Sequence, residues 1–264
     1  MDRLDKAVAT CGGIPRSEAG GLIRRGQVTV DGTVCRDPGR KLDPAVHTLA
    51  IGQRVLCSAA HLYIMLNKPQ GILCVSRDPK AETVVDLLPR EWRRRGMFPA
   101  GRLDKDTVGL VLLTDDGDWA HRVTAPRKAV IKHYRAVVEG RVGDDAVAAF
   151  AAGIPLDEET VCLPAEIAAL SADRFFDAPG GDKTALLNDF SAKYRIPLPP
   201  EFTLVDIAIQ EGRYHQIKRM CEAVGHKVLW LKRVSIGGLS LDGTLQEGES
   251  RLLSPAERES ALFR

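Results

Sequence analysis

The stretch that decides the fold is GRLDKDTVGLVLLTDDG, which runs from Gly101 to Gly117. Its apolar part, Val108 to Leu113, is too short for a typical helix and is rich in Val and Leu. Such a run predicts a strand that is covered on both faces. Gly101 permits a sharp bend before the strand, because glycine adopts backbone conformations that are closed to other residues. The order of residues therefore predicts that Asp104 lies at the mouth of a buried strand.

Other charged side chains accompany Asp104 in this stretch. If the backbone is extended, Arg102 and Asp104 point the same way, and a guanidinium beside a carboxylate favours its ionised form. An isolated R-x-D pattern is more often a structural ion pair at the end of a strand. We assign Asp106, Asp115 and Asp116 to turns and helix caps.

The composition is that of a folded protein with a core. Of the 264 residues, 44% are hydrophobic, which is enough for one large domain and a small one. The net charge is only +2, but basic residues cluster in residues 122–135 and 213–233. Such clusters fit a polyanionic partner, although solvated helix faces produce the same pattern.

Cysteine usage and hydropathy indicate the compartment. The six cysteines are widely spaced, with no C-x-x-C pair and no His at zinc-ligand spacing. We therefore expect neither a disulfide framework nor a metal site. Charged residues interrupt the apolar residues of the N-terminus, and no segment approaches the length of about 18 apolar residues that a membrane helix needs. These features predict a soluble cytoplasmic protein with no membrane segment.

Residues 1–56 predict a small basic module. Residues 3–10 and the segment after Ser17 have apolar residues at helical spacing, and Gly26 ends the second helix. Residues 28–35 then contain two short apolar runs around an Asp-Gly pair, which is the signature of a hairpin. A polar linker is predicted at residues 57–61.

Residues 62–264 predict a second domain in which strands and helices mix, so the fold class is α+β. A helix is predicted at residues 213–224 and a short one from Pro255 onward. Residues 171–201 are rich in Gly and Pro and are interpreted as an insertion or a long loop, a feature that is usually functional or mobile. Apolar patterns predict strands at residues 63–66, 130–139, 202–209, 228–231 and 234–241.

The N-terminal module resembles the small RNA-binding domain first known from ribosomal small-subunit protein S-four. The resemblance rests on R-L-D-K at Arg3 to Lys6, R-S-E-A at Arg16 to Ala19, and L-I-R-R-G-Q-V-T-V-D-G at Leu22 to Gly32. The remaining alternative is a basic helical hairpin that binds protein. The resemblance implies that polar side chains of the two helices contact phosphates and 2′-hydroxyls, namely Arg3, Arg16, Ser17, Arg24, Arg25 and Gln27.

Four motifs in the second domain, in this order, resemble the RsuA-type pseudouridine synthases. They are L-N-K-P-Q-G at Leu66 to Gly71, G-R-L-D-K-D-T-V-G-L at Gly101 to Leu110, K-H-Y at Lys132 to Tyr134, and E-G-R-Y-H-Q-I-K-R-M at Glu211 to Met220. This family isomerises uridine within RNA by breaking its glycosidic bond and rejoining the ribose to carbon 5 of the ring. The resemblance implies a largely antiparallel mixed sheet flanked by helices.

The same resemblance implies roles for five residues. Asp104 is the expected nucleophile, and it attacks either the ribose or the ring. Tyr134 is expected to pack against the uracil and to move the proton from carbon 5. Lys218 is expected to pair with Asp104, with Arg219 as the alternative, and Ile217 to pack against Tyr134.

Three further residues complete the expected site. Arg102 either enters the space that the flipped uridine vacates or holds Asp104 directly. His215 is assigned a structural role or a phosphate contact, because a lone histidine is more often that than a general base. Thr107 is expected to support the loop through its hydroxyl.

The sequence thus predicts a pseudouridine synthase without cofactor or metal that acts on ribosomal RNA. The matches A-G-R-L-D at Ala100 to Asp104 and T-D-D-G at Thr114 to Gly117 favour the small-subunit RNA as the substrate. The alternatives are a large-subunit target and an RNA-binding assembly factor that lost the chemistry. We expect a monomer, and we leave open whether the partner is free RNA or a partly assembled ribosomal subunit.

Overall fold

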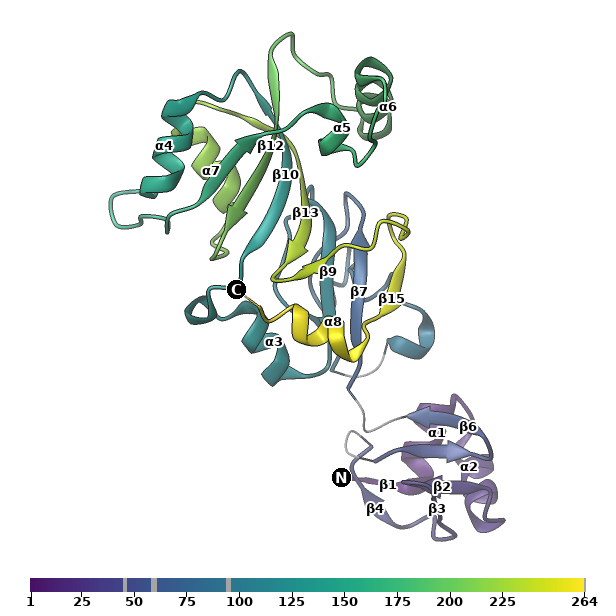
Figure 1. Cartoon of the computed structure of the whole chain (residues 1–264). Coiled ribbons are helices and arrows are strands. Elements are labelled where there is room, and N and C mark those ends of the chain that lie inside the picture. Colours follow the sequence, from purple (N-terminus) through teal and green to yellow (C-terminus); the bar gives the residue numbers. More distant parts are fainter. Residues whose placement is uncertain (45–46, 58–60, 94–95, 264) are drawn as a thin grey trace. The chain divides into compact units, whose positions relative to one another are not determined.

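The chain divides into two compact units, Met1–His61 and Leu62–Arg264. The computed structural model describes residues 1–44, 47–57, 61–93 and 96–263, and Figure 1 shows their elements in chain order. Residues 58–60 of the predicted linker lie outside the described residues. None of the described helices combines the length and the apolar character that a membrane-crossing segment needs.

The first unit packs two helices against a small antiparallel sheet. The sheet has the strand order β3-β2-β5-β6, and a separate pair joins β1 to β4. The predicted hairpin is confirmed, because Asp31 and Gly32 both have the positive φ of a type I′ turn and β2 pairs with β3. The elements are β1 Asp2–Arg3, α1 Leu4–Gly12, α2 Arg16–Arg24, β2 Val28–Val30, β3 Thr33–Val34, β4 Lys41–Leu42, β5 Leu49–Ile51 and β6 Arg54–Cys57.

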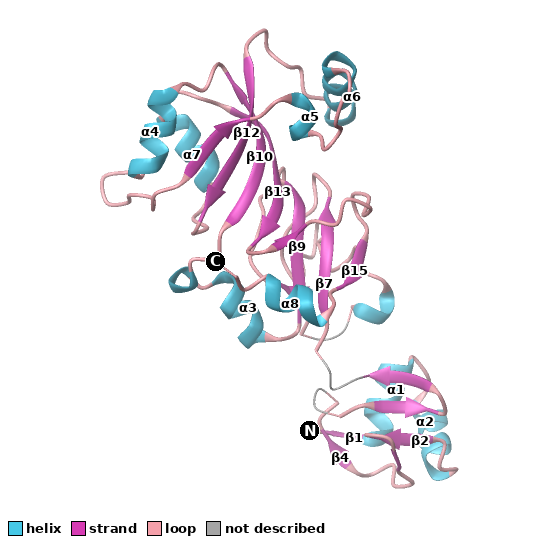
Figure 2. Ribbon diagram, viewed as in Figure 1, coloured by secondary structure: helices cyan, strands magenta, loops and turns pink. Residues whose placement is uncertain are grey.

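The second unit is built on one long sheet with helices on both sides (Figure 2). Its strands are β7 Tyr63–Lys68, β8 Phe98–Pro99, β9 Val108–Thr114, β10 Lys132–Glu139, β11 Glu166–Ala169, β12 Phe202–Ile209, β13 Val228–Ile236, β14 Leu239–Ser240 and β15 Ser250–Leu252. Its helices are α3 Gly117–Thr124, α4 Asp144–Ala152, α5 Ala172–Phe175, α6 Lys183–Tyr194, α7 Gln216–Ala223 and α8 Pro255–Ser260, with 3-10 turns η1 Arg90–Trp92 and η2 Pro126–Lys128.

The strand order of the main path is β11-β12-β10-β13-β9-β7-β15, with β14 beside β13 and β8 beside β9. Apart from the parallel pair of β9 and β13, the pairings between the described strands of this sheet are antiparallel. The predicted α+β fold with a largely antiparallel mixed sheet is therefore confirmed.

Strand β9 is buried along its whole length, as its apolar run predicts. Alternate residues of a strand point to opposite faces. Leu110 and Leu112 pack in one apolar cluster with Trp119 of α3. Val111 and Leu113 pack in another, which includes residues of α4 and α7. Helices cover both faces of the strand, which explains why its apolar residues do not alternate with polar ones.

Gly109 lets β9 and β13 approach each other. Its φ of +99° is rare for other residues, and a Cβ atom there would lie 2.3 Å from the carbonyl oxygen of Arg233. A side chain at this position would therefore push the two strands apart at the point where the site residues converge.

The prediction of two strands at residues 228–231 and 234–241 was wrong. Residues 228–236 form one continuous strand, because Lys232 and Arg233 continue the pairing with β10. Of the two alternatives for residues 171–201, a long loop does not hold, because the segment contains α5 and α6, and an insertion stays a prediction. The rings of Phe175, Phe190 and Tyr194 pack against Trp230 of β13. That tertiary contact stabilises two helices whose own sequence carries little helical periodicity.

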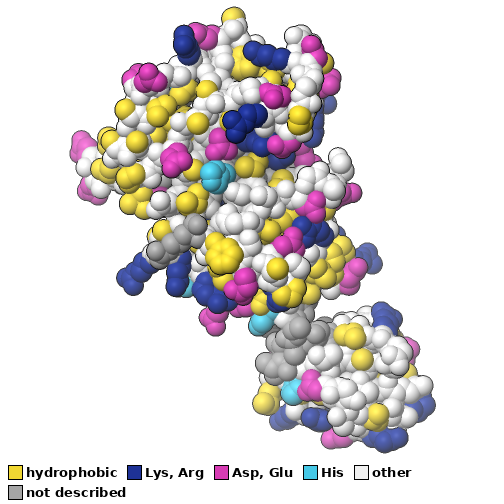
Figure 3. All heavy atoms as spheres, in the orientation of Figure 1, with side chains coloured by type: hydrophobic (Ala, Val, Ile, Leu, Met, Phe, Trp, Pro, Cys, Tyr) yellow, Lys and Arg dark blue, Asp and Glu magenta, His cyan; other side chains and the backbone are white. Residues whose placement is uncertain are grey.

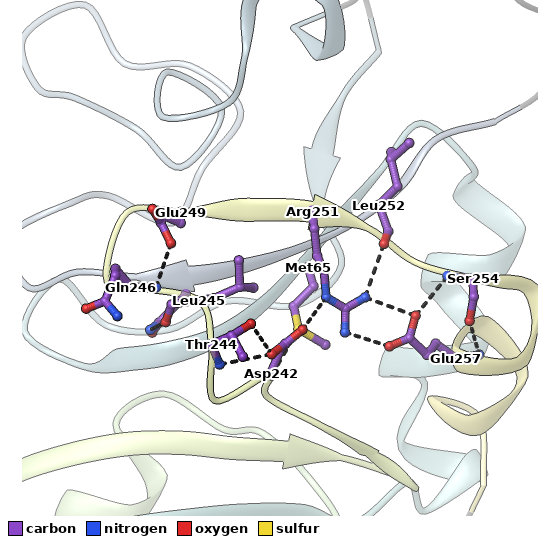
Figure 4. Close-up of polar contacts among 11 residues, drawn as sticks. Met65, Asp242, Thr244, Leu245, Gln246, Glu249, Arg251, Leu252, Ser254 and Glu257 are labelled. Atoms are coloured by element: carbon purple, nitrogen blue, oxygen red, sulfur yellow. Dashed lines mark hydrogen bonds and ion pairs between the residues drawn. The ribbon is translucent and has the colours of Figure 1, made fainter.

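An ion cluster closes the C-terminal part of the second unit (Figure 4). Arg251 Nε lies 2.6 Å from Asp242 Oδ2, and its two terminal nitrogens lie 2.6 and 3.0 Å from the carboxylate oxygens of Glu257. Ser254 and Glu257 form a capping box that starts α8. The cluster ties β15, the turn after β14 and the predicted terminal helix together.

The basic surface is smaller than the sequence clusters indicate. Figure 3 shows basic side chains over α3 and the turn after it, where Arg122, Arg127 and Lys128 are exposed. Lys132 of the same cluster is buried, and Arg135 pairs with an aspartate. The count of basic residues in residues 122–135 therefore overestimates the charge available to a polyanion.

Candidate active site

The loop between β8 and β9 presents Asp104, and a buried lysine anchors it. Gly101 starts the bend with a φ of +86°. Lys68 Nζ donates hydrogen bonds to the carbonyl oxygens of Lys105 at 3.2 Å and Thr107 at 2.8 Å. Burial lowers the pKa of Lys68 to about 8. The backbone on both sides of the loop tip is therefore held from β7.

Asp104 belongs to a small ion cluster. Lys218 Nζ, from α7, lies 3.2 Å from Asp104 Oδ2 and 2.6 Å from Asp106 Oδ1. His215 Nε2 lies 3.6 Å from Asp104 Oδ1. The expected contact between Asp104 and Lys218 is present, but it is shared, because the shorter distance is to Asp106.

The cluster corrects the role assigned to Asp106. Burial acts to raise the pKa of Asp106, but the hydrogen bond and the charge of Lys218 outweigh burial and the net pKa is lowered. Burial acts to lower the pKa of Lys218, and both carboxylates outweigh it to raise the net pKa. Asp106 is therefore not a turn residue alone, since it holds the lysine that faces Asp104.

A rigid loop places His215. Buried Glu211 accepts hydrogen bonds from Gln216 Nε2 at 3.0 Å and from Arg213 Nε at 2.9 Å. Gln216 Oε1 in turn accepts from the backbone N–H of Arg213. His215 has a φ of +48°, which is uncommon outside glycine, and the ring of Tyr214 stacks on it at 3.9 Å between centroids. His215 thus contacts the nucleophile candidate itself, which the sequence analysis did not foresee.

Tyr134 lies in β10 between β12 and β13 and is 7% exposed. It belongs to the same apolar cluster as Ile217. Its hydroxyl oxygen lies 3.5 Å from Nη1 of Arg233, a buried residue whose Nε donates to the carbonyl oxygen of Leu110. Arginine only donates, so the tyrosine oxygen is the acceptor in this contact.

These residues share one pocket of about 70 Å³. Strands β10, β12 and β13, helix α7 and the loops before β9 and α7 line it, so Asp104, Tyr134 and Lys218 lie around one pocket. Its lining residues are Arg102, Leu103, Asp104, Thr107, Tyr134, Ile209, Gly212, Arg213, His215, Gln216, Ile217, Lys218 and Leu231.

Three contacts that the sequence offered, two of them as alternatives for Asp104, are not found among the described residues. Arg102 is exposed on the pocket lining, and in the described part of the chain the ion partners of Asp104 are Lys218 and His215 instead. Arg219 points to Asp157 at 2.9 Å and so does not replace Lys218. Thr107 Oγ1 is buried without a hydrogen-bond partner among the described residues, so its hydroxyl does not support the loop.

The first unit gathers most of its expected RNA-binding residues in one hollow of about 620 Å³. Arg3, Arg16, Ser17 and Arg24 line it. Arg25 and Gln27 are outside this lining and hydrogen-bond to each other at 3.2 Å.

Asp5, which the sequence analysis missed, organises the hollow. Asp5 pairs with Arg3 at 3.1 Å and with Arg16 at 3.0 Å, and the hydrogen bond from Arg3 holds the pKa of Asp5 low, at about 2. The sequence signal that could have identified Asp5 is its position as a carboxylate among basic residues.

Comparison with known proteins identifies the class of enzyme. The family described as RNA pseudouridylate synthase matches residues 62–223, and the S4 domain matches residues 2–46. The chain therefore belongs to the RNA pseudouridylate synthase family, and the resemblance that the motifs carried is confirmed. Both matches imply an RNA-binding enzyme.

The relatives match nearly the full chain. It is 38% identical over 263 residues to Ribosomal small subunit pseudouridine synthase A of Escherichia coli (strain K12), covering 98% of this chain and 100% of that protein. It is 36% identical over 256 residues to the RNA pseudouridine synthase YtzG of Bacillus subtilis (strain 168), covering 97% and 96%. A crystal structure of a pseudouridylate synthase covers 99% of this chain and 100% of that chain, with 33% identity and a TM-score of 0.62.

Proposed function

We propose that the protein converts one uridine of small-subunit ribosomal RNA to pseudouridine, with Asp104 as the nucleophile. The observation that carries the proposal is the position of Asp104, which lies 3.2 Å from Lys218 in a pocket that Tyr134 also lines. Relatives with the small-subunit name, which align over nearly the full chain, support the choice of substrate. In this proposal the protein acts in the cytoplasm, where ribosomal RNA is found, and it acts as a monomer.

The reaction balances without an oxidant, a reductant or a cofactor. The bond from ribose carbon 1′ to ring nitrogen 1 breaks, a bond from carbon 1′ to carbon 5 forms, and the hydrogen on carbon 5 leaves as nitrogen 1 takes up a proton. A base inside a helix is out of reach, so the uridine is extruded into the pocket. The Asp104 carboxylate, with Lys218 beside it, then bonds to ribose carbon 1′ as the bond to nitrogen 1 breaks, or adds to the ring; in either route this bond breaks again and frees Asp104 once carbon 1′ has joined carbon 5.

Tyr134 and Arg102 have supporting parts in this scheme. The buried ring of Tyr134 offers an apolar face to the uracil, and its hydroxyl is the proposed carrier of the proton from carbon 5. The exposed Arg102 guanidinium is proposed to stack in the space that the uridine leaves. The hollow of the first unit, lined by Arg3, Arg16 and Arg24, is proposed to bind the RNA backbone.

The test maps new pseudouridines after incubation with unmodified small-subunit RNA, unmodified large-subunit RNA and partly assembled subunits. We expect one modified position in the small-subunit RNA. Product only in the large-subunit RNA would reassign the target. Product in none of them would contradict the enzyme and favour an assembly factor.

The variant Asp104→Asn tests the nucleophile. We expect its rate to fall by at least about a thousandfold, because the amide does not form the covalent bond. Asp118→Asn, on an exposed helix position of the same domain, is the matched control and should keep the parent rate. A rate for Asp104→Asn within tenfold of the parent would rule out Asp104 as nucleophile.

A further inference from the structure

Tyr214 is the most exposed aromatic side chain among the described residues, with 74% of its surface open to solvent. One exposed apolar side chain is ordinary by itself. This one stands directly before α7, next to a residue that contacts Asp104. Its two chain neighbours, Arg213 and His215, both line the pocket that contains Asp104.

The ring is held in a fixed orientation. It stacks on His215 with 3.9 Å between the centroids and 15° between the planes. The edge of the imidazole that carries Nε2 points toward the site, since His215 Nε2 lies 3.6 Å from Asp104 Oδ1. One face of the Tyr214 ring is therefore used for support, and the exposed fraction leaves the other face available.

The backbone around Tyr214 is also built to stay in place. Buried Glu211 accepts from the N–H of Leu163 at 2.9 Å and from side chains of Arg213 and Gln216, which brace both ends of the loop. His215 keeps a left-handed φ of +48°, which costs energy and persists only where the surroundings enforce it. The hydrogen bonds of Glu211 hold the loop, so the exposed ring of Tyr214 is pre-organised to contact a binding partner.

The surroundings select the partner. Arg102 and Arg213 both line the adjacent pocket and are exposed. Glu211 pairs with Arg213, whereas Arg102 has no ion partner among the described residues, so a phosphate is favoured beside Arg102. When a uridine leaves its stack, the neighbouring base loses a stacking partner, and an aromatic side chain can take that partner's place.

We propose that Tyr214 is a stacking subsite for the unpaired base next to the target uridine. This inference rests on the proposed RNA substrate and deepens it. The subsite recognises a flat base in a single-stranded segment and does not read its identity, because every base has a π-face. His215 acts through Tyr214 as a positioning residue that joins this subsite to the Asp104 cluster.

The test uses a single-stranded oligoribonucleotide with a central uridine and 2-aminopurine on one side of it, in two versions. Stacking on an aromatic ring quenches the fluorescence of 2-aminopurine. The 2-aminopurine stands on the 5′ side of the uridine in one version and on the 3′ side in the other. For one of these versions we expect quenching by the parent and by Tyr214→Phe, and loss of quenching with Tyr214→Leu. Equal quenching by the parent and Tyr214→Leu in both versions would overturn the subsite, as would a loss with Tyr214→Phe equal to that with Tyr214→Leu.

The second measurement is the rate on whichever ribosomal RNA the parent modifies. We expect kcat/KM of Tyr214→Leu to fall by roughly tenfold to a hundredfold, mainly through KM, with Tyr214→Phe within about twofold of the parent. Phe263→Leu, at another exposed aromatic position, is the control and should match the parent.

The two measurements separate the proposals. If no RNA is modified but the quenching follows Tyr214, the proposed reaction fails and the subsite stands. If RNA is modified and Tyr214→Leu keeps the parent KM and kcat, the subsite fails alone. An equal melting temperature for the three Tyr214 proteins excludes misfolding as the cause of a loss.

Discussion

Two clusters in the larger unit each place one cation between two carboxylates, but they differ in how completely the cation bonds to them. In the C-terminal cluster, Arg251 binds Asp242 and grips both oxygens of Glu257 within 3.0 Å (Figure 4). The planar guanidinium matches a carboxylate geometrically, so the bonds are short and directed. This cluster has little capacity left for a ligand.

In the active-site cluster the cation is a lysine, a point charge with no fixed fork. Lys218 lies closer to Asp106 than to Asp104, and the pocket remains open beside Asp104. Asp104 thus keeps charge-stabilising neighbours without being fully bonded. The difference shows how the same charge pattern serves packing in one place and leaves a carboxylate facing a pocket in the other.

Removing the lysine should have the largest effect. For Lys218→Met we expect kcat on RNA to fall on the order of 100-fold, because Asp104 and Asp106 lose the cation that lies beside both. The pKa of Asp106, which Lys218 lowers, should rise in this variant. Rates measured on the mapped RNA check the loss of activity.

Lys218→Arg is the matched control for the charge, and most of the activity should return with it. A Lys218→Met enzyme within about threefold of the parent would show that the cluster does not support the chemistry. The melting temperature should change little in either variant.

Breaking the C-terminal cluster should lower stability and leave activity unchanged, the reverse of the effect expected for Lys218→Met. For Arg251→Ala we expect the free energy of unfolding to fall by about 1–2 kcal/mol, because directed bonds to partly buried carboxylates are lost, with kcat unchanged well below the melting temperature. Urea unfolding at pH 7 measures the loss. Arg77→Ala, at an exposed position, should stay near the parent.

This stability difference has a defined pH window. The hydrogen bond from Arg251 lowers the pKa of Glu257 from 4.5 to about 2, and hydrogen bonds led by that of Thr244 lower the pKa of Asp242 to about 2. A depressed carboxyl pKa adds stability that is complete above the unfolded value and is lost as the pH falls through the folded value. The gap between parent and Arg251→Ala should therefore shrink between pH 5 and 2, and a constant gap would contradict the assignment.

The smallest effect is expected for Asp106→Asn. The amide oxygen still accepts a hydrogen bond from Lys218, so we expect kcat/KM to stay within about tenfold of the parent. Steady-state rates beside those of Lys218→Met check the order. A loss as large as that of Lys218→Met would give Asp106 a part in the chemistry and not only in holding the lysine.

The sequence carried the local features well. The short Val and Leu run predicted β9, the Asp-Gly pair predicted the hairpin, and Asp116 caps α3 through the N–H of Trp119 as its position implied. These features depend on a few neighbouring residues, so they are readable from a single chain.

The partners of charged residues were harder to predict, because they are decided by packing between distant segments. Asp106 was assigned to a turn, but α7 brings Lys218 to it. Arg219 follows Lys218 directly and yet points to Asp157, since successive helical residues face different directions. Arg233 was counted only in a basic cluster and fell between two predicted strands, and the pairing of β13 with β10 is what places it beside Tyr134.

The parallel pairing of β9 with β13 bears on when the enzyme becomes competent. It joins Val108 to Lys232, so it closes a long loop of chain, and contacts of that kind form slowly because much chain entropy is lost first. During synthesis the Asp104 loop emerges well before α7 and β13. Until the chain beyond residue 232 is made, a nascent protein already carries Asp104 but lacks the strand and the helix that complete the pocket around it.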